Sequence, residues 1–124
     1  MSWSVLLLVL LCAVLTAVSN LLFRHSVVHV GEMTPAAAGV IETVWRLIQQ
    51  PAFIIGFIGY GTAAVVWFRI LRLAEVSTSY PILVGLTFIL VTLGATLAFR
   101  ESISVAKIVG ISMILVGIVI AARG

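Results

Sequence analysis

The polar side chains that could do chemistry in this chain lie mostly inside long apolar runs. In the first run, Thr16, Ser19 and Asn20 share one helical face, and Arg24 follows one turn beyond Asn20. An amide without a hydrogen-bond partner in hydrocarbon costs several kcal/mol, so Asn20 must face protein or water. This face therefore predicts hydrogen bonding, either to a polar ligand or to a neighbouring helix.

Aromatic and hydroxyl side chains in the next two runs are further candidates. Tyr60 lies near the middle of its run, where it can stack on a ligand in a cavity or pack against another helix. Trp67 shares its face but lies near the end of the run, so we expect it to anchor the helix at the membrane surface. Tyr80 and Thr87 are seven residues apart, which places them on one face beside a cavity or a second subunit. A single threonine is weak evidence, because it often bonds its own helix.

Acidic side chains are absent from the interior of these runs. The four in the chain, Glu32, Glu42, Glu75 and Glu101, all fall between the runs. Proton-coupled transporters normally bury a carboxylate or a histidine as the proton site. The sequence also has no metal-ligand cluster, no nucleophile paired with a base and no phosphate-binding glycine loop. We therefore expect no enzymatic activity, no metal and no cofactor, and the usual basis for proton coupling is missing.

The composition places these side chains in a membrane protein. Of the 124 residues, 63% are hydrophobic and 9% are charged, whereas soluble domains are about 45–50% apolar and about 25% charged. The mean hydropathy is +1.33. Seven basic residues spread along such a chain form no stripe that could follow a phosphate backbone, so a nucleic-acid partner is excluded despite a pI of about 9.8.

Four apolar runs are long enough to cross a bilayer, which takes about 20 residues each. We expect one all-α domain over 1–124, a four-helix transmembrane bundle. The expected spans are about 3–23, 52–73, 80–99 and 104–122. Because turns of about five residues join the last three spans, these should be antiparallel neighbours. Ser104 is placed to cap the last one.

The segment 35–50, between the first two spans, predicts a short helix that begins with Thr34 as N-cap and Pro35 in its first turn. Glu42 and Arg46 can pair on one face. The opposite face is apolar and consists of Val40, Ile41, Val44, Trp45 and Ile48. This pattern is typical of a helix lying in the membrane interface. A helix packed on the bundle outside the membrane is the alternative.

Two glycines mark one face of the last span. Gly110 and Gly117 are seven residues apart and are separated by bulky apolar side chains. Small residues at such spacing let helix backbones approach closely. The pair predicts helix packing, either within the bundle or between subunits, although glycine is common in membrane helices anyway.

The order and spacing of several short motifs resemble the drug/metabolite transporter superfamily. The segments 76–81 and 101–104, followed by Lys107, resemble the entry to the third helix and the turn before the last helix in its small four-helix members. The segment 19–24 resembles the helix 1 pattern of the aminoarabinose-lipid flippase subunits. Taken together, these motifs cover most of the chain outside 25–50.

Two branches of that superfamily fit, and they imply different functions. The small multidrug resistance proteins exchange protons for cations as antiparallel dimers. Their essential glutamate corresponds to about Thr16, while Tyr60 and Tyr80 match their substrate-site tyrosines and Gly110 and Gly117 match their dimer-contact glycines. The flippase subunits do not depend on that glutamate and keep an amide where Asn20 stands. The chain looks closer to the flippase branch.

The resemblance implies a small transporter or flippase subunit of the bacterial inner membrane that works as a homodimer or heterodimer by alternating access. Its cargo would be a polyprenyl-phosphate-linked sugar or a similar amphipathic lipid, and Arg24 would meet the phosphate, which suits its planar fork. The expected substrate-binding residues are Thr16, Asn20, Arg24, Tyr60, Tyr80 and Thr87. An exporter of small organic cations and a non-transporting membrane scaffold remain as alternatives.

Overall fold

Helices make up nearly all of residues 2–123, the part of the chain that this computed structural model describes. Four of these helices are long and apolar enough to cross a membrane: α1 (Trp3–Met33), α3 (Pro51–Leu73), α4 (Val76–Ala98) and α5 (Val105–Arg123). A short helix, α2 (Val40–Ile48), lies between the first two of them. No strand forms within the described residues. The expected four-helix membrane bundle is confirmed.

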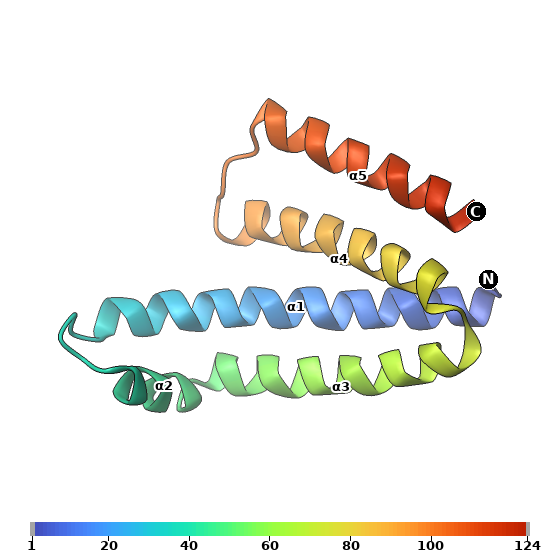
Figure 1. Ribbon diagram of the computed structural model, residues 1–124. Coiled ribbons are helices and arrows are strands. Elements are labelled where there is room, and N and C mark those ends of the chain that lie inside the picture. The colour runs from blue at the N-terminus through green and yellow to red at the C-terminus, as the bar shows by residue number, and fades with distance from the viewer. Residues whose placement is uncertain (1, 124) are drawn as a thin grey trace.

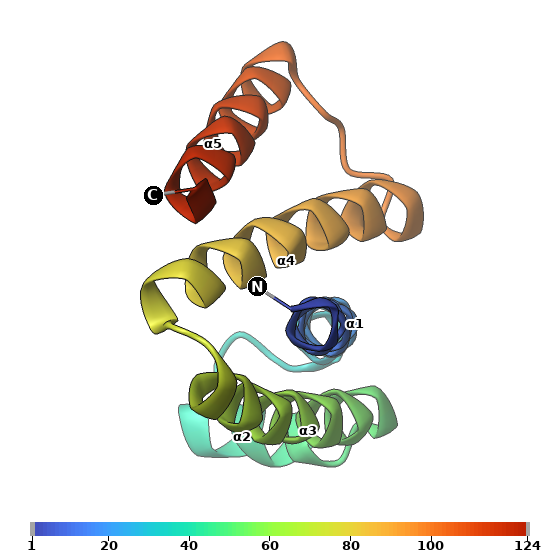
Figure 2. The ribbon, with the colours of Figure 1, turned by 90° about the vertical axis from the view of Figure 1, so that its right-hand side faces the viewer.

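α1 lies at the centre of the bundle, with α3 on one side and α4 on the other (Figures 1 and 2). α5 packs on α4 alone, as expected of helices joined by a short turn. The expectation that α3 and α4 would also be neighbours is wrong, because α1 lies between them and they meet only near their shared turn. A short turn brings two helix ends together, but it does not prevent a third helix from lying between the helices.

Small side chains explain the close packing of α1 and α3. On α1, Ala13, Ala17 and Ser19 are almost fully buried. Gly56 and Gly59 of α3 face Ser19: a Cβ added at Gly59 would lie 2.6 Å from the Ser19 Oγ. In lipid, such small residues replace hydrophobic burial as the means of helix association, because close backbones gain dispersion contacts.

α1 is longer than the sequence predicts, since it continues to Met33 instead of ending near residue 23. At 1.5 Å per residue its 31 residues extend about 46 Å, and the hydrocarbon core is about 30 Å thick. The last turns of α1 therefore extend beyond the bilayer. Arg24 and His25 mark the end of the apolar run. A helix can nevertheless continue past a charged residue after it leaves the membrane.

The predicted start of α2 is also wrong. Thr34 caps the end of α1 with an extended backbone, which agrees with the clash that proline causes in a preceding helical residue. α2 begins only at Val40, after Gly39 as N-cap. The expected pair of Glu42 and Arg46 does form, with 2.9 Å between a carboxylate oxygen and a guanidinium nitrogen.

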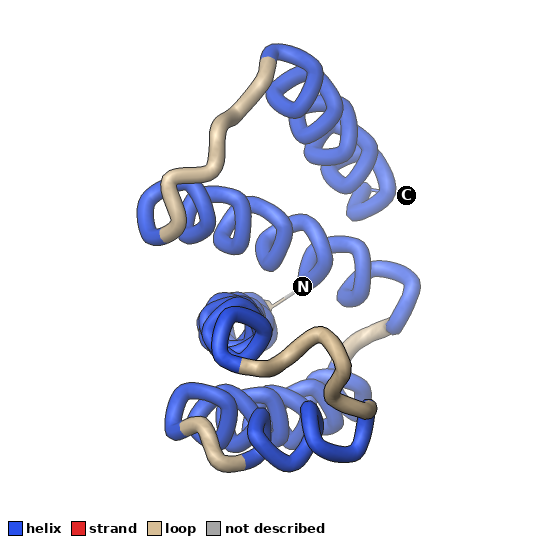
Figure 3. The backbone as a smooth tube through the Cα atoms, turned by 90° about the vertical axis from the view of Figure 1, so that its left-hand side faces the viewer, coloured by secondary structure: helices blue, strands red, loops and turns tan. Residues whose placement is uncertain are grey.

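α2 turns its apolar face away from the bundle. Ile41 is 88% exposed and Trp45 is 62% exposed, whereas Arg46 donates a hydrogen bond to the Met33 carbonyl oxygen at the end of α1. In Figure 3, which looks along α1, α2 runs across the view. An exposed apolar face on a short helix that crosses the direction of α1 is the pattern of an interfacial helix, and this placement stays a prediction.

α4 and α5 end close to the expected positions. α4 begins at Val76, earlier than the expected residue 80, so Tyr80 and Pro81 lie inside the helix. The predicted cap of α5 is confirmed, because the Lys107 N–H donates to the Ser104 Oγ at 3.1 Å. None of the residues of α5 is buried, which leaves most of its surface unpartnered.

Candidate functional site

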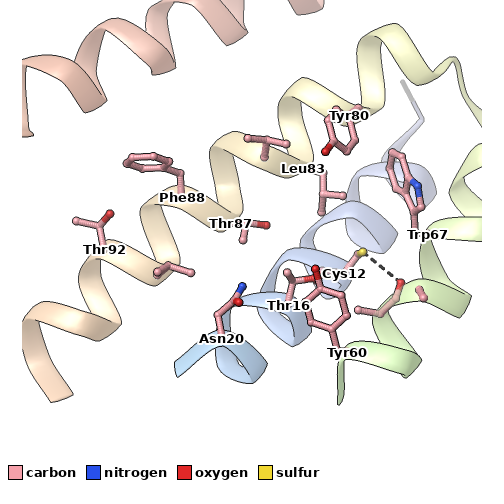
Figure 4. Close-up of a pocket in the computed structure, with 14 residues that line it drawn as sticks. Cys12, Thr16, Asn20, Tyr60, Trp67, Tyr80, Leu83, Thr87, Phe88 and Thr92 are labelled. Carbon is pink, nitrogen blue, oxygen red and sulfur yellow. Dashed lines mark hydrogen bonds between the residues drawn. The ribbon is translucent and has the colours of Figure 1, made fainter. Parts of the chain in front are cut away.

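A pocket of about 540 Å³ lies where α1, α3 and α4 meet. Figure 4 shows the side chains that surround it. α1 provides Cys12, Thr16 and Asn20; α3 provides Tyr60, Ala63, Ala64 and Trp67; α4 provides Tyr80, Leu83, Val84, Thr87, Phe88, Val91 and Thr92. The central position of α1 creates this pocket, because α3 and α4 are held apart on its two sides.

The structure brings together five of the six residues that the sequence analysis proposes as substrate contacts. They are Thr16, Asn20, Tyr60, Tyr80 and Thr87. They come from three helices that are far apart in the sequence, and in Figure 4 the Asn20 amide and the Thr87 hydroxyl point into the space between α1 and α4. Substrate contact by these residues stays a prediction.

Arg24, the sixth residue, does not line this pocket. Its guanidinium nitrogen lies 2.9 Å from a carboxylate oxygen of Glu101, in the connection between α4 and α5. The guanidinium carbon also lies 5.5 Å from the centre of the Phe99 ring, within the range of a cation–π contact. Arg24 therefore ties α1 to the α4–α5 connection, one helical turn beyond Asn20.

The hydroxyl groups of the pocket differ in their hydrogen bonds. The Thr16 Oγ1 donates to the Cys12 carbonyl oxygen at 2.8 Å, so its proton is already used within α1. The Thr87 Oγ1 is buried and has no hydrogen-bond partner within residues 2–123. A buried polar group without a partner is costly. Thr87 is thus free to bond a ligand that enters the pocket.

Aromatic rings form much of the pocket wall. The rings of Trp67 and Tyr80 lie with their centres 5.7 Å apart and are tilted by 57°. Tyr60 is 48% exposed and Tyr80 is 53% exposed, so both lie at an open edge of the pocket. For Trp67 the sequence analysis favours a membrane anchor, whereas the structure places its ring in the pocket wall. Its spacing of seven residues from Tyr60 could have indicated that place.

The pocket wall carries no charged side chain among the described residues. Arg24 pairs outside it, and Glu32, Glu42, Glu75 and Glu101 lie at helix ends or in connections. Burying an unpaired charge in such a wall would be expensive. The pocket is therefore suited to polar groups that bind through hydrogen bonds and the faces of aromatic rings, without an ion pair to its wall.

The pocket is elongated along the helices that span the membrane. On α4 it extends from Tyr80 to Thr92, a rise of about 18 Å at 1.5 Å per residue. This is more than half of the roughly 30 Å hydrocarbon thickness. Polar side chains thus occur at several depths along one side of α1 and α4.

The two glycines of α5 have no part in packing within the chain. A Cβ added at Gly110 or at Gly117 would meet nothing within 4 Å. Neither glycine therefore brings α5 into close contact with α4. Packing between subunits stays a prediction.

Four helices long enough to span a membrane, three of which surround an elongated pocket with an uncharged wall, are the features of a small multi-pass membrane protein of the transport class. Comparison with known proteins supports this class. The chain is 30% identical over 113 residues to a protein of Proteus mirabilis, covering 91% of this chain and 92% of that protein. That protein is named a probable 4-amino-4-deoxy-L-arabinose-phosphoundecaprenol flippase subunit, ArnE. The chain belongs to the family of these small ArnE-type flippase subunits.

Two other relatives also align with most of the chain. A protein of Pseudomonas savastanoi pv. phaseolicola with the same name is 29% identical over 118 residues, which cover 95% of this chain and 94% of that protein. An uncharacterized protein of Sinorhizobium fredii, y4nH, is 33% identical over 90 residues, 73% of this chain and 74% of that protein. No family model and no solved structure matches the chain.

Proposed function

We propose that this chain is a subunit of an inner-membrane flippase that moves a polyprenyl-phosphate-linked sugar across the bilayer. The observation that carries this proposal is the uncharged pocket along α1 and α4, which offers hydrogen bonds and aromatic faces through more than half of the bilayer thickness. The names of the relatives from Proteus mirabilis and Pseudomonas savastanoi point to aminoarabinose as the sugar.

The sugar would lie in the pocket between α1, α3 and α4. The Asn20 amide and the Thr87 hydroxyl would bond its hydroxyl groups, and Tyr60 and Tyr80 would stack against its apolar face. The polyprenyl chain would remain on the lipid side of the bundle.

The phosphate would contact Arg24 at one membrane surface. A guanidinium binds phosphate oxygens with two parallel hydrogen bonds. Arg24 is 53% exposed and is held by Glu101 through one contact of 2.9 Å, so an arriving phosphate would compete with that carboxylate. Arg69 and Arg72, near the end of α3 at the opposite surface, would receive the phosphate after translocation.

A second subunit would complete the translocation pathway. The pocket is open on the side of Tyr60 and Tyr80, and α5 has no buried residue. A homodimer, or a heterodimer with another four-helix subunit, would cover these surfaces. Alternating access would then expose the pocket to each side of the membrane in turn.

Energy for net movement would come from the concentration difference of the lipid-linked sugar. The acidic side chains lie at helix ends and in connections, where they are poorly placed to act as an intramembrane proton site. Transport should therefore continue when the proton gradient is collapsed.

Replacing Asn20 tests this function. In cells that make 4-amino-4-deoxy-L-arabinose-phosphoundecaprenol, Asn20→Ala should reduce its exposure on the outer leaflet by about tenfold, since a lost hydrogen bond inside a protein costs about 1–1.5 kcal/mol. Val18→Ala is the matched control, because Val18 is 50% exposed on α1 and does not line the pocket. Normal exposure in Asn20→Ala, at normal protein levels, would remove Asn20 from the site.

Export of small organic cations is a second candidate function. The rings of Tyr60, Trp67 and Tyr80 in the pocket wall favour it, because aromatic faces attract cations. A partner subunit would have to supply the acidic residue. Resistance to quaternary ammonium compounds in cells that express this chain together with such a partner, lost when the proton gradient collapses, would support export of cations over the flippase.

A further inference from the structure

A second pocket, of about 340 Å³, lies between α4 and α5 on the lipid side of the bundle. We call it the tail groove. Its walls are mainly apolar, with Ala95 from α4 and Gly110, Ile111 and Ile114 from α5. Gly110 leaves space in the wall, since nothing lies within 4 Å of the position where its Cβ would be. The tail groove thus has the volume and the lining for the first units of a single hydrocarbon chain.

The charged residues of the tail groove lie at one end, near the membrane surface. Glu101 and Lys107 both line this end. The Glu101 carboxylate is already paired with Arg24 at 2.9 Å, whereas Lys107 is exposed in the first turn of α5. The end of the groove therefore carries a net positive charge, which favours an anionic group there.

The tail groove adjoins the pocket between α1, α3 and α4, which we call the sugar pocket. Phe88, Val91 and Thr92 of α4 line both of them. A lipid with its phosphate at the charged end of the groove could place its sugar in the sugar pocket and its chain in the tail groove, on either side of these three α4 side chains. Arg24 and Glu101 lie at the end where such a molecule would carry its charge.

We propose that the tail groove binds the first isoprene units of a polyprenyl phosphate, with the phosphate beside Lys107 and the attached sugar in the sugar pocket. This proposal rests on the proposed function and adds a binding site for the lipid part of the substrate. The polyprenyl chain is then held between α4 and α5 during translocation, and Lys107 in the first turn of α5 recognises the phosphate.

Substitutions at two glycines of α5 distinguish lipid binding in the tail groove from packing between subunits. Gly110 lines the tail groove, and Gly117, two turns along the same helix, does not. A Cβ at either position meets nothing within 4 Å, so both accept a larger side chain without a clash inside the chain. Gly110→Leu should fill the groove, and Gly117→Leu is its matched control.

The binding of radiolabelled farnesyl phosphate to the protein in phosphatidylcholine nanodiscs tests the proposal, with empty nanodiscs as the blank. Gly110→Leu should weaken binding about tenfold or more, because it occupies the volume of one isoprene unit, and Gly117→Leu should leave it unchanged. Lys107→Gln should weaken binding about fivefold, the effect of one basic residue at a membrane surface. Lys107→Arg, which keeps the positive charge, should bind farnesyl phosphate as well as the unmodified protein does.

Three results would overturn the proposal that the tail groove binds a polyprenyl phosphate. They are no binding of the probe to the unmodified protein, equal weakening of binding by both leucine variants, or displacement of the probe by dioleoyl phosphatidate as readily as by unlabelled farnesyl phosphate. The last of these would indicate a general phospholipid site. Because farnesyl phosphate carries no sugar, Asn20→Ala should bind it normally. Failure of the proposed function would appear separately, as normal outer-leaflet exposure of the lipid-linked sugar in Asn20→Ala.

Discussion

The α1–α3 interface and the α4–α5 interface are built in opposite ways. Between α1 and α3, small residues bring the backbones so close that a Cβ at Gly56 would lie 3.2 Å from the Ser19 carbonyl oxygen. Between α4 and α5 there is a groove, and none of the residues of α5 is buried. Glycine serves both interfaces, but it allows contact in one and leaves space in the other.

This difference assigns different tasks to the two regions. Dispersion contacts across α1 and α3 hold the bundle together, since apolar burial gives no net gain in lipid. α5 gains little from such contacts and is left available for a lipid chain or a second subunit. The Arg24–Glu101 pair connects the two regions, because it joins α1 to the connection before α5.

The largest effect is expected where the backbones are closest. Gly56→Leu should lower the free energy of unfolding by about 3 kcal/mol, the upper range for overpacking, because its neighbours are backbone and the Phe23 ring at 3.0 Å. Unfolding of the protein in detergent micelles, followed by circular dichroism, measures this loss. Gly61→Leu is the control, since nothing lies within 4 Å of a Cβ at Gly61. Similar stability of the two variants would contradict tight packing of α1 on α3.

A smaller effect, of opposite sign, is expected on α4, which packs against both α1 and α5. Thr87→Val keeps the shape of the side chain and removes a buried hydroxyl without a partner, so the free energy of unfolding should rise by about 1 kcal/mol. Outer-leaflet exposure of the lipid-linked sugar should fall in the same variant. Thr96→Val is the control and should gain no stability, because its hydroxyl bonds the Thr92 carbonyl oxygen at 2.8 Å. Destabilisation by Thr87→Val would mean that the hydroxyl serves the fold.

Hydropathy predicted the spanning helices well, because the bilayer thickness fixes the length of each apolar run. It failed at the end of α1, where Arg24 marks the limit of the lipid and the backbone remains helical to Met33. The residue before Pro35 was the better indication of the helix end. The position of α1 between α3 and α4 depends on which helix faces with small residues pack together. The lengths of the connections do not predict this packing.

The site was partly predictable for a similar reason. Asn20 stood out because an amide in lipid requires a partner, and the structure places it beside Thr87 and Tyr60 on one pocket. The pairing of Arg24 with Glu101 was not predictable. These two residues are far apart in the sequence, and no local pattern relates a residue near the end of the first span to the turn before the last.

The smallest effect on folding is expected on α5. Gly117→Leu should change the free energy of unfolding of the single chain by less than about 0.5 kcal/mol, as for a substitution on an open surface. If α5 forms the contact between subunits, the same variant should shift the protein from dimer to monomer in analytical ultracentrifugation, because a leucine separates helices that glycine allows to touch. Ala121→Leu, on the exposed end of α5, is the control. An unchanged dimer would place the subunit contact elsewhere and leave α5 to the lipid chain alone.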